Sequence, residues 1–352
     1  MRCVLKNVFI RVIGLALLSA AAPGAIMASP AAPEWSVEQQ WSVGGAGGWD
    51  YLTLDPSGRR LFVSRATRVD VVSTESGKVI GTIPDTSGVH GIALATNLKR
   101  GFTSNGKADS VTVFDLDTLK TIKEIKISGH NPDAILYEPK GKHIFTFDGK
   151  SKDVTVIDAE TMQIAATLPV PDKPEFAADD GEGQIYANIE SDPGQMVVID
   201  SRALSIKATW PLPGCSSPSG LAIDRLHHRL FSVCDGKVMV VTDARTGKQV
   251  ARVAVGEGPD AAAYDAKRGL VFSSNGEGTL TIVHQDTPDK YQVVDALATQ
   301  RGARTMALDT VTGKVYLVTA KFGPAPAATA DQPHPRPALI PDTFTILVVG
   351  AH

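Results

Sequence analysis

Three features of the amino-acid sequence predict an all-β fold, a seven-bladed β-propeller. A short segment recurs seven times at spacings of 40 to 44 residues. Within each copy the apolar residues alternate or form runs of four to six, which is typical of strands and not of helices. A further strand-like segment precedes the first copy, and the last copy lacks one. Four short strands repeated at this period indicate propeller blades.

The repeat is clearest in the first and third strands of each copy. First strands include NPDAILYEP at 131–139 and GPDAAAYDA at 258–266, and third strands include VTVF at 111–114 and VTVI at 154–157. The copies begin near residues 47, 87, 130, 172, 215, 257 and 301. In four copies an aspartate follows the third strand, where its carboxylate can accept backbone hydrogen bonds in the turn. We therefore assign these aspartates to structure and not to a site: Asp115, Asp158, Asp200 and Asp243.

The two ends of the repeat region predict how the ring closes. The last copy ends with FTILVVGAH at 344–352, its third strand, whereas EWSVEQQWSVGG at 34–45 resembles a fourth strand with no preceding three. One strand from the N-terminal side would complete the last blade. Such closure removes exposed sheet edges, which otherwise promote aggregation.

Residues 1–28 have the layout of a secretory signal peptide. Three positive charges flank the start, an apolar stretch VIGLALLSAAA follows, and small residues lead to Ala28. A membrane anchor is the alternative, but about a dozen apolar residues are too few to span a bilayer comfortably. We expect a periplasmic or secreted protein with no membrane span after cleavage, and one propeller domain over 29–352.

A closed ring has no obligate need of a partner, so we expect a monomer.

The charge balance bears on the class of partner. The chain has 35 Lys and Arg and 38 Asp and Glu, and three of the positive residues lie in the leader, which leaves 32 against 38. Affinity for nucleic acid comes largely from clustered Lys and Arg. The composition therefore argues against nucleic acid as the main partner.

Two cysteines lie outside the leader, Cys215 and Cys234. The repeat alignment places both at the same end of one hairpin. Because an oxidising compartment preserves disulfides, we expect these two residues to be bonded. Two buried free thiols are the alternative.

The repeats also resemble a known family, the YVTN-repeat propellers, often called YncE-like, many of which are exported bacterial proteins. The resemblance is carried by FTSNGKADSVTVFD at 102–115, IFTFDGKSKDVTVID at 144–158 and FSSNGEGTLTIV at 272–283, and it extends over nearly all of the exported part. It implies the propeller fold. It implies no particular activity, because these motifs consist of strand and turn residues and propellers carry unrelated chemistries.

One position in each copy should reach the central channel. The first strand of a propeller blade lines this channel, so the start of each first strand opens on one mouth. The aligned residues form the inner ring: Asp50, His90, Asp133, Glu175, Ser219, Asp260 and Arg304. The ends of the second strands should bring a second set to the same face: Arg65, Asn105, Asp148, Cys234 with Asp235, Asn275 and Lys321.

Several interpretations of these two sets remain open. The polar groups could simply bond to one another and to water at a wet channel mouth. They could bind a polar or cationic small molecule or a peptide. His90 lies between Asp50 and Asp133, so a carboxylate-oriented imidazole could act as a base. The same three residues with Glu175 could hold a divalent metal ion, which is the one cofactor that the sequence suggests.

The largest irregularity is a proline-rich insertion at 323–342 in the seventh copy. It includes His334 and Arg336, and by the alignment it leaves from the face that carries the inner ring. Its proline content favours extended chain over new secondary structure. It could cover the mouth as a lid, or it could be a disordered insertion.

The sequence thus favours an exported propeller that binds a polar small molecule or a protein partner at the mouth. Whether it is also an enzyme stays open, and the enzyme alternative is a metal-assisted hydrolase or lyase, by analogy with propeller lactonases. A third class is a structural platform that uses blade edges and loops to bind other proteins. The first two classes use the channel mouth, whereas the third does not depend on it.

Overall fold

The computed structural model describes residues 34–327 and 337–352, which belong to one compact unit, Pro33–His352. The predicted signal peptide at 1–28 and the insertion residues His334 and Arg336 lie outside the described residues. Within the described ranges, no helix has the length and apolar character needed to cross a membrane.

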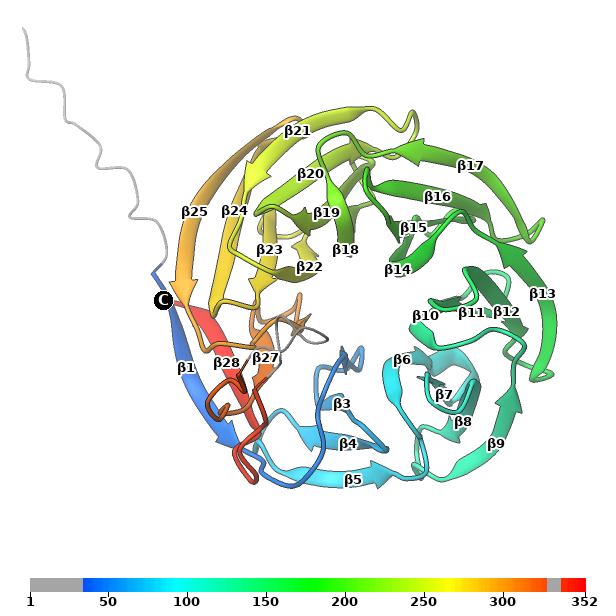
Figure 1. Cartoon of the computed structure of the whole chain (residues 1–352), viewed down its shortest axis with the longest axis horizontal. Helices are drawn as coiled ribbons and strands as arrows, with labels where there is room; N and C mark the ends of the chain where they lie inside the picture. The colour runs from blue at the N-terminus through cyan, green and yellow to red at the C-terminus, as the bar shows by residue number, and fades with distance from the viewer. Residues whose placement is uncertain (1–33, 328–336) are drawn as a thin grey trace, which may run out of the picture. The chain divides into compact units, whose positions relative to one another are not determined.

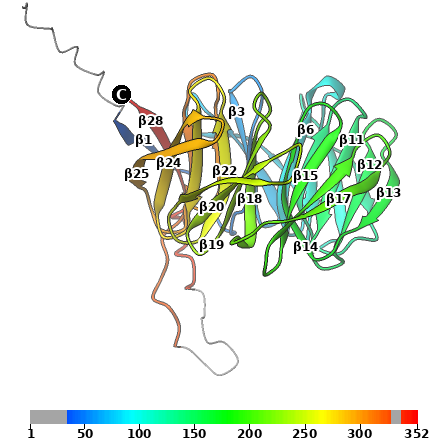
Figure 2. The same ribbon diagram turned by 90° about the horizontal axis from the view of Figure 1, so that it is seen from above.

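Seven antiparallel sheets of four strands each surround a central axis (Figure 1), which confirms the predicted seven-bladed propeller. Figure 2 shows the sheets from the side, where β10–β13 and β14–β17 lie next to each other. In blades one to six the strands follow chain order from the channel to the rim. The only helical element among the described residues is a short 3₁₀ turn, η1 (Thr96–Leu98).

The strands of the first three blades have the following bounds. Blade one contains β2 (Leu52–Leu54), β3 (Arg60–Arg65), β4 (Arg68–Ser73) and β5 (Val79–Ile83). Blade two contains β6 (Val89–Ala95), β7 (Arg100–Asn105), β8 (Ser110–Asp115) and β9 (Thr121–Lys126). Blade three contains β10 (Pro132–Glu138), β11 (His143–Asp148), β12 (Asp153–Asp158) and β13 (Gln163–Pro169).

The next three blades repeat this arrangement. Blade four contains β14 (Lys173–Asp179), β15 (Gln184–Glu190), β16 (Gln195–Asp200) and β17 (Ser205–Pro211). Blade five contains β18 (Ser216–Asp224), β19 (Arg229–Asp235), β20 (Val238–Asp243) and β21 (Gln249–Ala254). Blade six contains β22 (Pro259–Asp265), β23 (Leu270–Asn275), β24 (Thr279–Thr287) and β25 (Lys290–Ala298).

Blade seven is assembled from both ends of the repeat region. Its inner strands are β26 (Met306–Leu308), β27 (Val315–Thr319) and β28 (Thr345–Ala351), and its outer strand is β1 (Trp35–Ser42). β1 pairs antiparallel with β28 from Trp35 opposite Ala351 to Ser42 opposite Thr345. This confirms that the N-terminal strand closes the ring.

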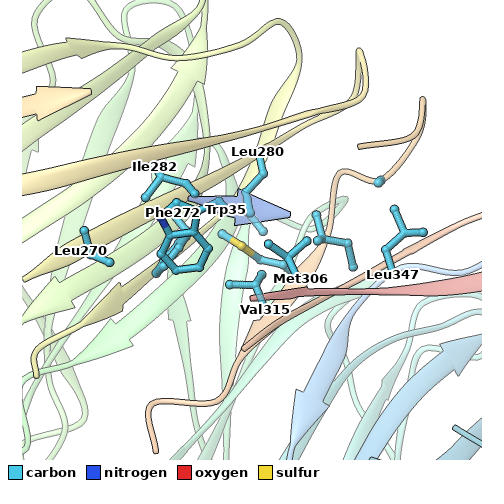
Figure 3. Close-up of a cluster of buried hydrophobic side chains, with 12 residues drawn as sticks. Trp35, Leu270, Phe272, Leu280, Ile282, Met306, Val315 and Leu347 are labelled. Carbon is cyan, nitrogen blue, oxygen red and sulfur yellow. The ribbon is translucent and has the colours of Figure 1, made fainter. Parts of the chain in front are cut away.

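The hydrophobic core consists of clusters between neighbouring blades. In the cluster between blades six and seven, the buried Trp35 of β1 meets Phe272 of β23 edge to face, with ring centroids 5.4 Å apart (Figure 3). Fully burying a large apolar side chain stabilises a protein by about 1.5 to 3 kcal/mol. The closing strand is therefore held by packing as well as by its ladder of hydrogen bonds.

The turns after the third strands confirm the structural role assigned to their aspartates. Asp115 Oδ1 accepts the backbone N–H groups of Asp117 and Thr118 at 3.1 and 2.7 Å. Asp158, Asp200 and Asp243 accept the corresponding pairs of N–H groups in their own blades. These acids hold turns together and lie away from the channel mouth.

The predicted disulfide joins Cys215 and Cys234, which are 19 residues apart with Cα atoms separated by 5.3 Å. It ties the start of β18 to the end of β19, next to the channel mouth. Closing a loop of this length restricts the unfolded chain and stabilises the folded one by about 3 kcal/mol in the chain-entropy model. The bond therefore fixes the inner strand of blade five where it approaches the site.

Candidate functional site at the channel mouth

All seven residues of the predicted inner ring line one cavity of about 860 Å³ at the channel mouth. The local reason is a bulge near the start of the first strand in blades two to six. The pairing shifts register between Pro132 and Ile135 in β10, and at equivalent points in β6, β14, β18 and β22. A bulge re-aims the side chains it contains. Each bulge spans the ring position of its blade, so these side chains project into the cavity.

Serine and threonine hydroxyl groups fix the ring from blade to blade. Ser104 of β7 donates to the backbone carbonyl of Asp133 in the next blade, and Ser274 of β23 does the same to Arg304. Thr305 donates to the carbonyl of Asp50 at 2.6 Å, which links blade seven to blade one. Because these bonds join neighbouring blades, the ring side chains start from a rigid frame.

The most compact group in the ring is Asp50, His90 and Asp133. His90 Nδ1 is 2.6 Å from Asp50 Oδ2 and 3.7 Å from Asp133 Oδ1. Burial lowers the pKa of His90, but the hydrogen bond to Asp50 and the charge of Asp133 outweigh it and raise that pKa above 6.5. Burial raises the pKa of Asp133 to about 6, although the neighbouring His90 acts in the opposite direction. The imidazole is thus held between two carboxylates and favours its protonated form.

Next to Asp133, blade four adds two more acidic residues, Glu175 and Glu190. Lys173 bridges the carboxylates of Glu175 and Glu190. Burial, reinforced by the charge of Asp133, raises the pKa of Glu175 to about 8 despite the nearby Lys173. Glu175 therefore favours its protonated form near neutral pH, in spite of its contact with Lys173.

On the other side, Arg304 pairs with Asp260 and lies 3.5 Å from Asp50. Ser219 donates to Asp260 Oδ1 at 3.0 Å. Burial raises the pKa of Asp260, whereas the charge of Arg304 acts against this increase. Ionic contacts and hydrogen bonds thus connect Asp133 through His90, Asp50, Arg304 and Asp260 to Ser219.

Aromatic side chains complete the cavity. Tyr51 of blade one stacks on Phe176 of blade four with ring centroids 4.6 Å apart, so this pair crosses the channel. Trp49 packs on Phe322, 6.2 Å away, and on Phe344, 5.5 Å away. Trp49, Tyr51, Phe176 and Phe322 all line the cavity. The mouth is therefore a pocket in which acidic and aromatic surfaces face the same volume.

The residues at the ends of the second strands, which were expected at the channel mouth, mostly lie outside the cavity. Of these residues only Asp235 lines the cavity. Cys234 is in the disulfide, and Lys321 is exposed outside the cavity. The other four are at most 1% exposed and lie under the ring: Arg65, Asn105, Asp148 and Asn275.

Asn105, Asp148 and Asn275 bond within their own blades, whereas Arg65 donates to the loop at 44–47. The Asn105 side chain accepts from Thr103 and donates to Ser110 and Thr112 at 2.8 to 3.2 Å, and Asn275 repeats this pattern with Ser273, Thr279 and Thr281. The second strand ends beside the first, as in the pairing of Val89 with Asn105. Its last side chain therefore turns toward the third strand and not toward the channel.

Several lining residues were missed by reasoning from the sequence. Lys173 and Glu190 lie at the ends of strands, where the repeat alignment gave them no weight. Pro337 and Leu339 come from the described base of the insertion. The insertion's start on the ring face was a usable signal for these two, whereas the stacking of Tyr51 on Phe176 depends on contacts across the channel that no local pattern records.

Comparisons with known proteins were consistent with the fold. Residues 50–223 match the model of the cytochrome D1 heme domain family. Among solved structures, hydrazine synthase of Kuenenia stuttgartiensis is similar with a TM-score of 0.68 at 20% identity, over 77% of this chain and 92% of that chain. U3-55K is similar with a TM-score of 0.72 at 10% identity, over 87% and 97%. No curated protein matched.

The family description raises the question of whether a heme fits the pocket. A heme iron takes a His, Cys, Met or Tyr ligand, and among the described lining residues only His90 and Tyr51 are of these types. Tyr51 is stacked on Phe176, and the bond from His90 Nδ1 to Asp50 leaves Nε2 of His90 as the one imidazole nitrogen that could take an iron. A heme brings its own carboxylates to a lining that already has six, and on this ground the residues present do not fit it. The chain is a seven-bladed β-propeller in which residues 50–223 are similar to the cytochrome D1 heme domain family, and the similarity carries the fold and not a heme site.

Proposed function

We propose that this protein binds a small cationic ligand in the pocket at the channel mouth. The observation that carries the proposal is the charge of the described lining residues. Three permanent cations, Lys173, Arg301 and Arg304, and the imidazole of His90 face six carboxyl groups, so acidic groups outnumber basic ones: Asp50, Asp133, Glu175, Glu190, Asp235 and Asp260. The cavity of about 860 Å³ falls in the range of small-molecule sites, which is roughly 300 to 1,000 Å³.

The electrostatics of the buried carboxylates support a positive ligand. Burial and mutual repulsion disfavour the ionised forms of Asp133 and Glu175, which is why both pKa values are raised. A cation bound among them would supply the missing positive charge in a region where charges interact strongly. An anion would instead add to the repulsion.

The proposal keeps the expectation that the protein is exported and YncE-like. The disulfide between Cys215 and Cys234 supports this expectation, because such bonds persist mainly in oxidising compartments. A soluble capture protein outside the cytoplasm would meet small cations directly.

The first test is calorimetric titration of the purified protein with methylammonium and with Mn²⁺. Replacing Asp133 by Asn is expected to weaken the binding of either cation at least tenfold, because it removes a buried charge from the pocket without changing its shape. The matched control is Asp117→Asn, which changes an exposed acid that pairs with Lys99 far from the mouth. Binding that is equal in wild type and Asp133→Asn would contradict the proposal, as would a wild type that binds neither cation.

A second candidate function is metal-assisted hydrolysis or lyase chemistry. One observation favours it: Asp50, His90 and Asp133 each offer a ligand atom, and these atoms lie within 4.8 Å of one another. Imidazole and carboxylate groups suit Mn²⁺, Zn²⁺ and related ions. The fourth residue of the sequence-based set, Glu175, is not in this group and pairs with Lys173.

The enzyme candidate predicts about one equivalent of a divalent metal after purification and turnover of simple lactones or esters. Both should be lost in a His90→Ala variant. A protein that retains metal without turnover would leave metal binding alone. If His90→Ala and Asp133→Asn behaved as wild type in binding and in turnover, the remaining class would be an interaction platform.

A further inference from the structure

One side of the pocket is apolar, and we call it the apolar wall: Trp49, Phe322 and Leu339. A bare metal ion would make no apolar contact with these side chains. Trp49 comes from the loop before blade one, and Phe322 and Leu339 come from the two sides of the insertion in blade seven. Phe322 and Leu339 form a β-bridge. Bonds from Gly323 N to Ala338 O and from Ile340 N to Lys321 O, both 2.8 Å, fasten the base of the insertion. This wall is therefore a built part of the mouth.

The apolar wall and the acidic ring face the same volume. Tyr51 lines the same cavity as four carboxylates of the inner ring: Asp50, Asp133, Glu175 and Asp260. The face of an aromatic ring attracts a cation within about 6 Å, and cages of such rings recognise ammonium ions. An ammonium group also has hydrogen-bond donors for the carboxylates.

We propose that the ligand is an organic ammonium ion with an apolar or aromatic body. Its ammonium group would lie among Asp50, Asp133 and the neighbouring carboxylates, and its body would pack on Trp49 and Phe322. This inference rests on the proposed function, since it names the chemical class of the cation. It also explains why a site with surplus acid is lined by four aromatic rings.

The test compares three probes by calorimetry at one pH. 2-Phenylethylammonium has both the charge and the body, methylammonium has only the charge, and 3-phenylpropanoate has a similar body with the opposite charge. We expect 2-phenylethylammonium to bind at least tenfold more tightly than methylammonium, and 3-phenylpropanoate not to bind.

Substitution of Phe322 tests whether the apolar wall causes the tighter binding of 2-phenylethylammonium. Phe322→Ala should remove most of the advantage of 2-phenylethylammonium, about tenfold for the lost apolar contact with its phenyl body, and should leave methylammonium binding unchanged. Val311→Ala is the matched control, because Val311 is an exposed apolar residue of the same blade that does not line the pocket. Thermal unfolding of each variant checks that the propeller is intact.

The outcomes separate the inference from the proposed function. If methylammonium or Mn²⁺ binds and 2-phenylethylammonium binds no more tightly, the inference is wrong and a cation site remains. If none of the cations binds, both are wrong. Binding of 3-phenylpropanoate as tight as that of 2-phenylethylammonium would also overturn both, because the pocket would then select for apolar surface and not for positive charge.

Discussion

Replacing Asp148 by Asn is expected to stabilise the protein above neutral pH and to flatten the dependence of its stability on pH. Asp148 is fully buried at the end of β11. Its Oδ2 accepts from Thr155 at 2.6 Å, whereas its Oδ1 has no hydrogen-bond partner among the described residues. Burial, together with the nearby Asp153, raises the pKa of Asp148 to about 8.

The sign of the effect follows from this raised pKa. The protonated form of Asp148 is favoured in the folded protein, so its contribution to stability is complete below the ordinary pKa of 3.8 and is lost as pH rises toward 8. A pKa displaced from 3.8 to about 8 corresponds to a loss on the order of 5 kcal/mol at pH 9. Asn has the shape of protonated Asp and no charge, so it avoids this loss.

The same position in two other blades already contains Asn. Asn105 and Asn275 bond to Ser and Thr residues of the third strand in blades two and six. The reverse change, Asn105→Asp, should therefore introduce a buried carboxyl group whose ionisation lowers the stability of the protein above neutral pH. Urea unfolding of wild type and both variants at pH 5 and pH 9 measures the difference. An Asp148→Asn variant that is no more stable than wild type at pH 9 would contradict the argument.

The Arg65→Met substitution is expected to cost about 3 to 5 kcal/mol, the usual effect of removing one partner from a buried charged network. The guanidinium of Arg65 is fully buried and donates to the backbone carbonyls of Gly44, Gly45, Ala46 and Gly47 at 3.1 to 3.3 Å. It also lies 3.7 Å from the centre of the Phe344 ring and 3.6 Å from Asp70. Removing it leaves the carbonyl groups of Gly44, Gly45 and Gly47 without this donor, whereas Arg68 still bonds to Ala46 and Asp70.

The same change should reach the pocket. The four carbonyl groups belong to the loop that leads into Trp49, so the loss of Arg65 should also weaken ligand binding through the apolar wall. The comparison is Arg68→Met, since the Arg68 side chain pairs with the same Asp70 but is 29% exposed and donates to only one of the four carbonyl groups, that of Ala46, so we expect a smaller loss. Urea unfolding within 1 kcal/mol of wild type for Arg65→Met would show that the loop does not depend on this residue.

Much of the fold was predictable because blade geometry repeats. The period of the first and third strands predicts the number of blades, and the segment around Trp35 predicts ring closure, since both depend on local strand patterns. The inner ring from Asp50 to Arg304 was predictable for the same reason: its members occupy one position of a repeated strand. The disulfide followed from placing both cysteines at one end of a hairpin.

The remaining features depend on contacts that the repeat does not encode. The neighbouring strands decide whether a side chain at the end of a second strand faces the channel or its own blade. Asn105 and Asp148 face the third strand of their own blades. The stacking of Tyr51 on Phe176 joins blades on opposite sides of the channel. The signal peptide at 1–28 and the export of the protein stay predictions.

The pairing of β1 with β28 also determines how the molecule resists tension. Trp35 is opposite Ala351, and the backbone N–H of His352 donates to the carbonyl of Glu34 at 2.9 Å, so the outer ends of this strand pair leave from one point. A pull on Glu34 and His352 in opposite directions loads the hydrogen bonds one after another and not in parallel. Each bond is weak by itself. The ring therefore unzips first at its closure, while the six other sheets still hold their shape.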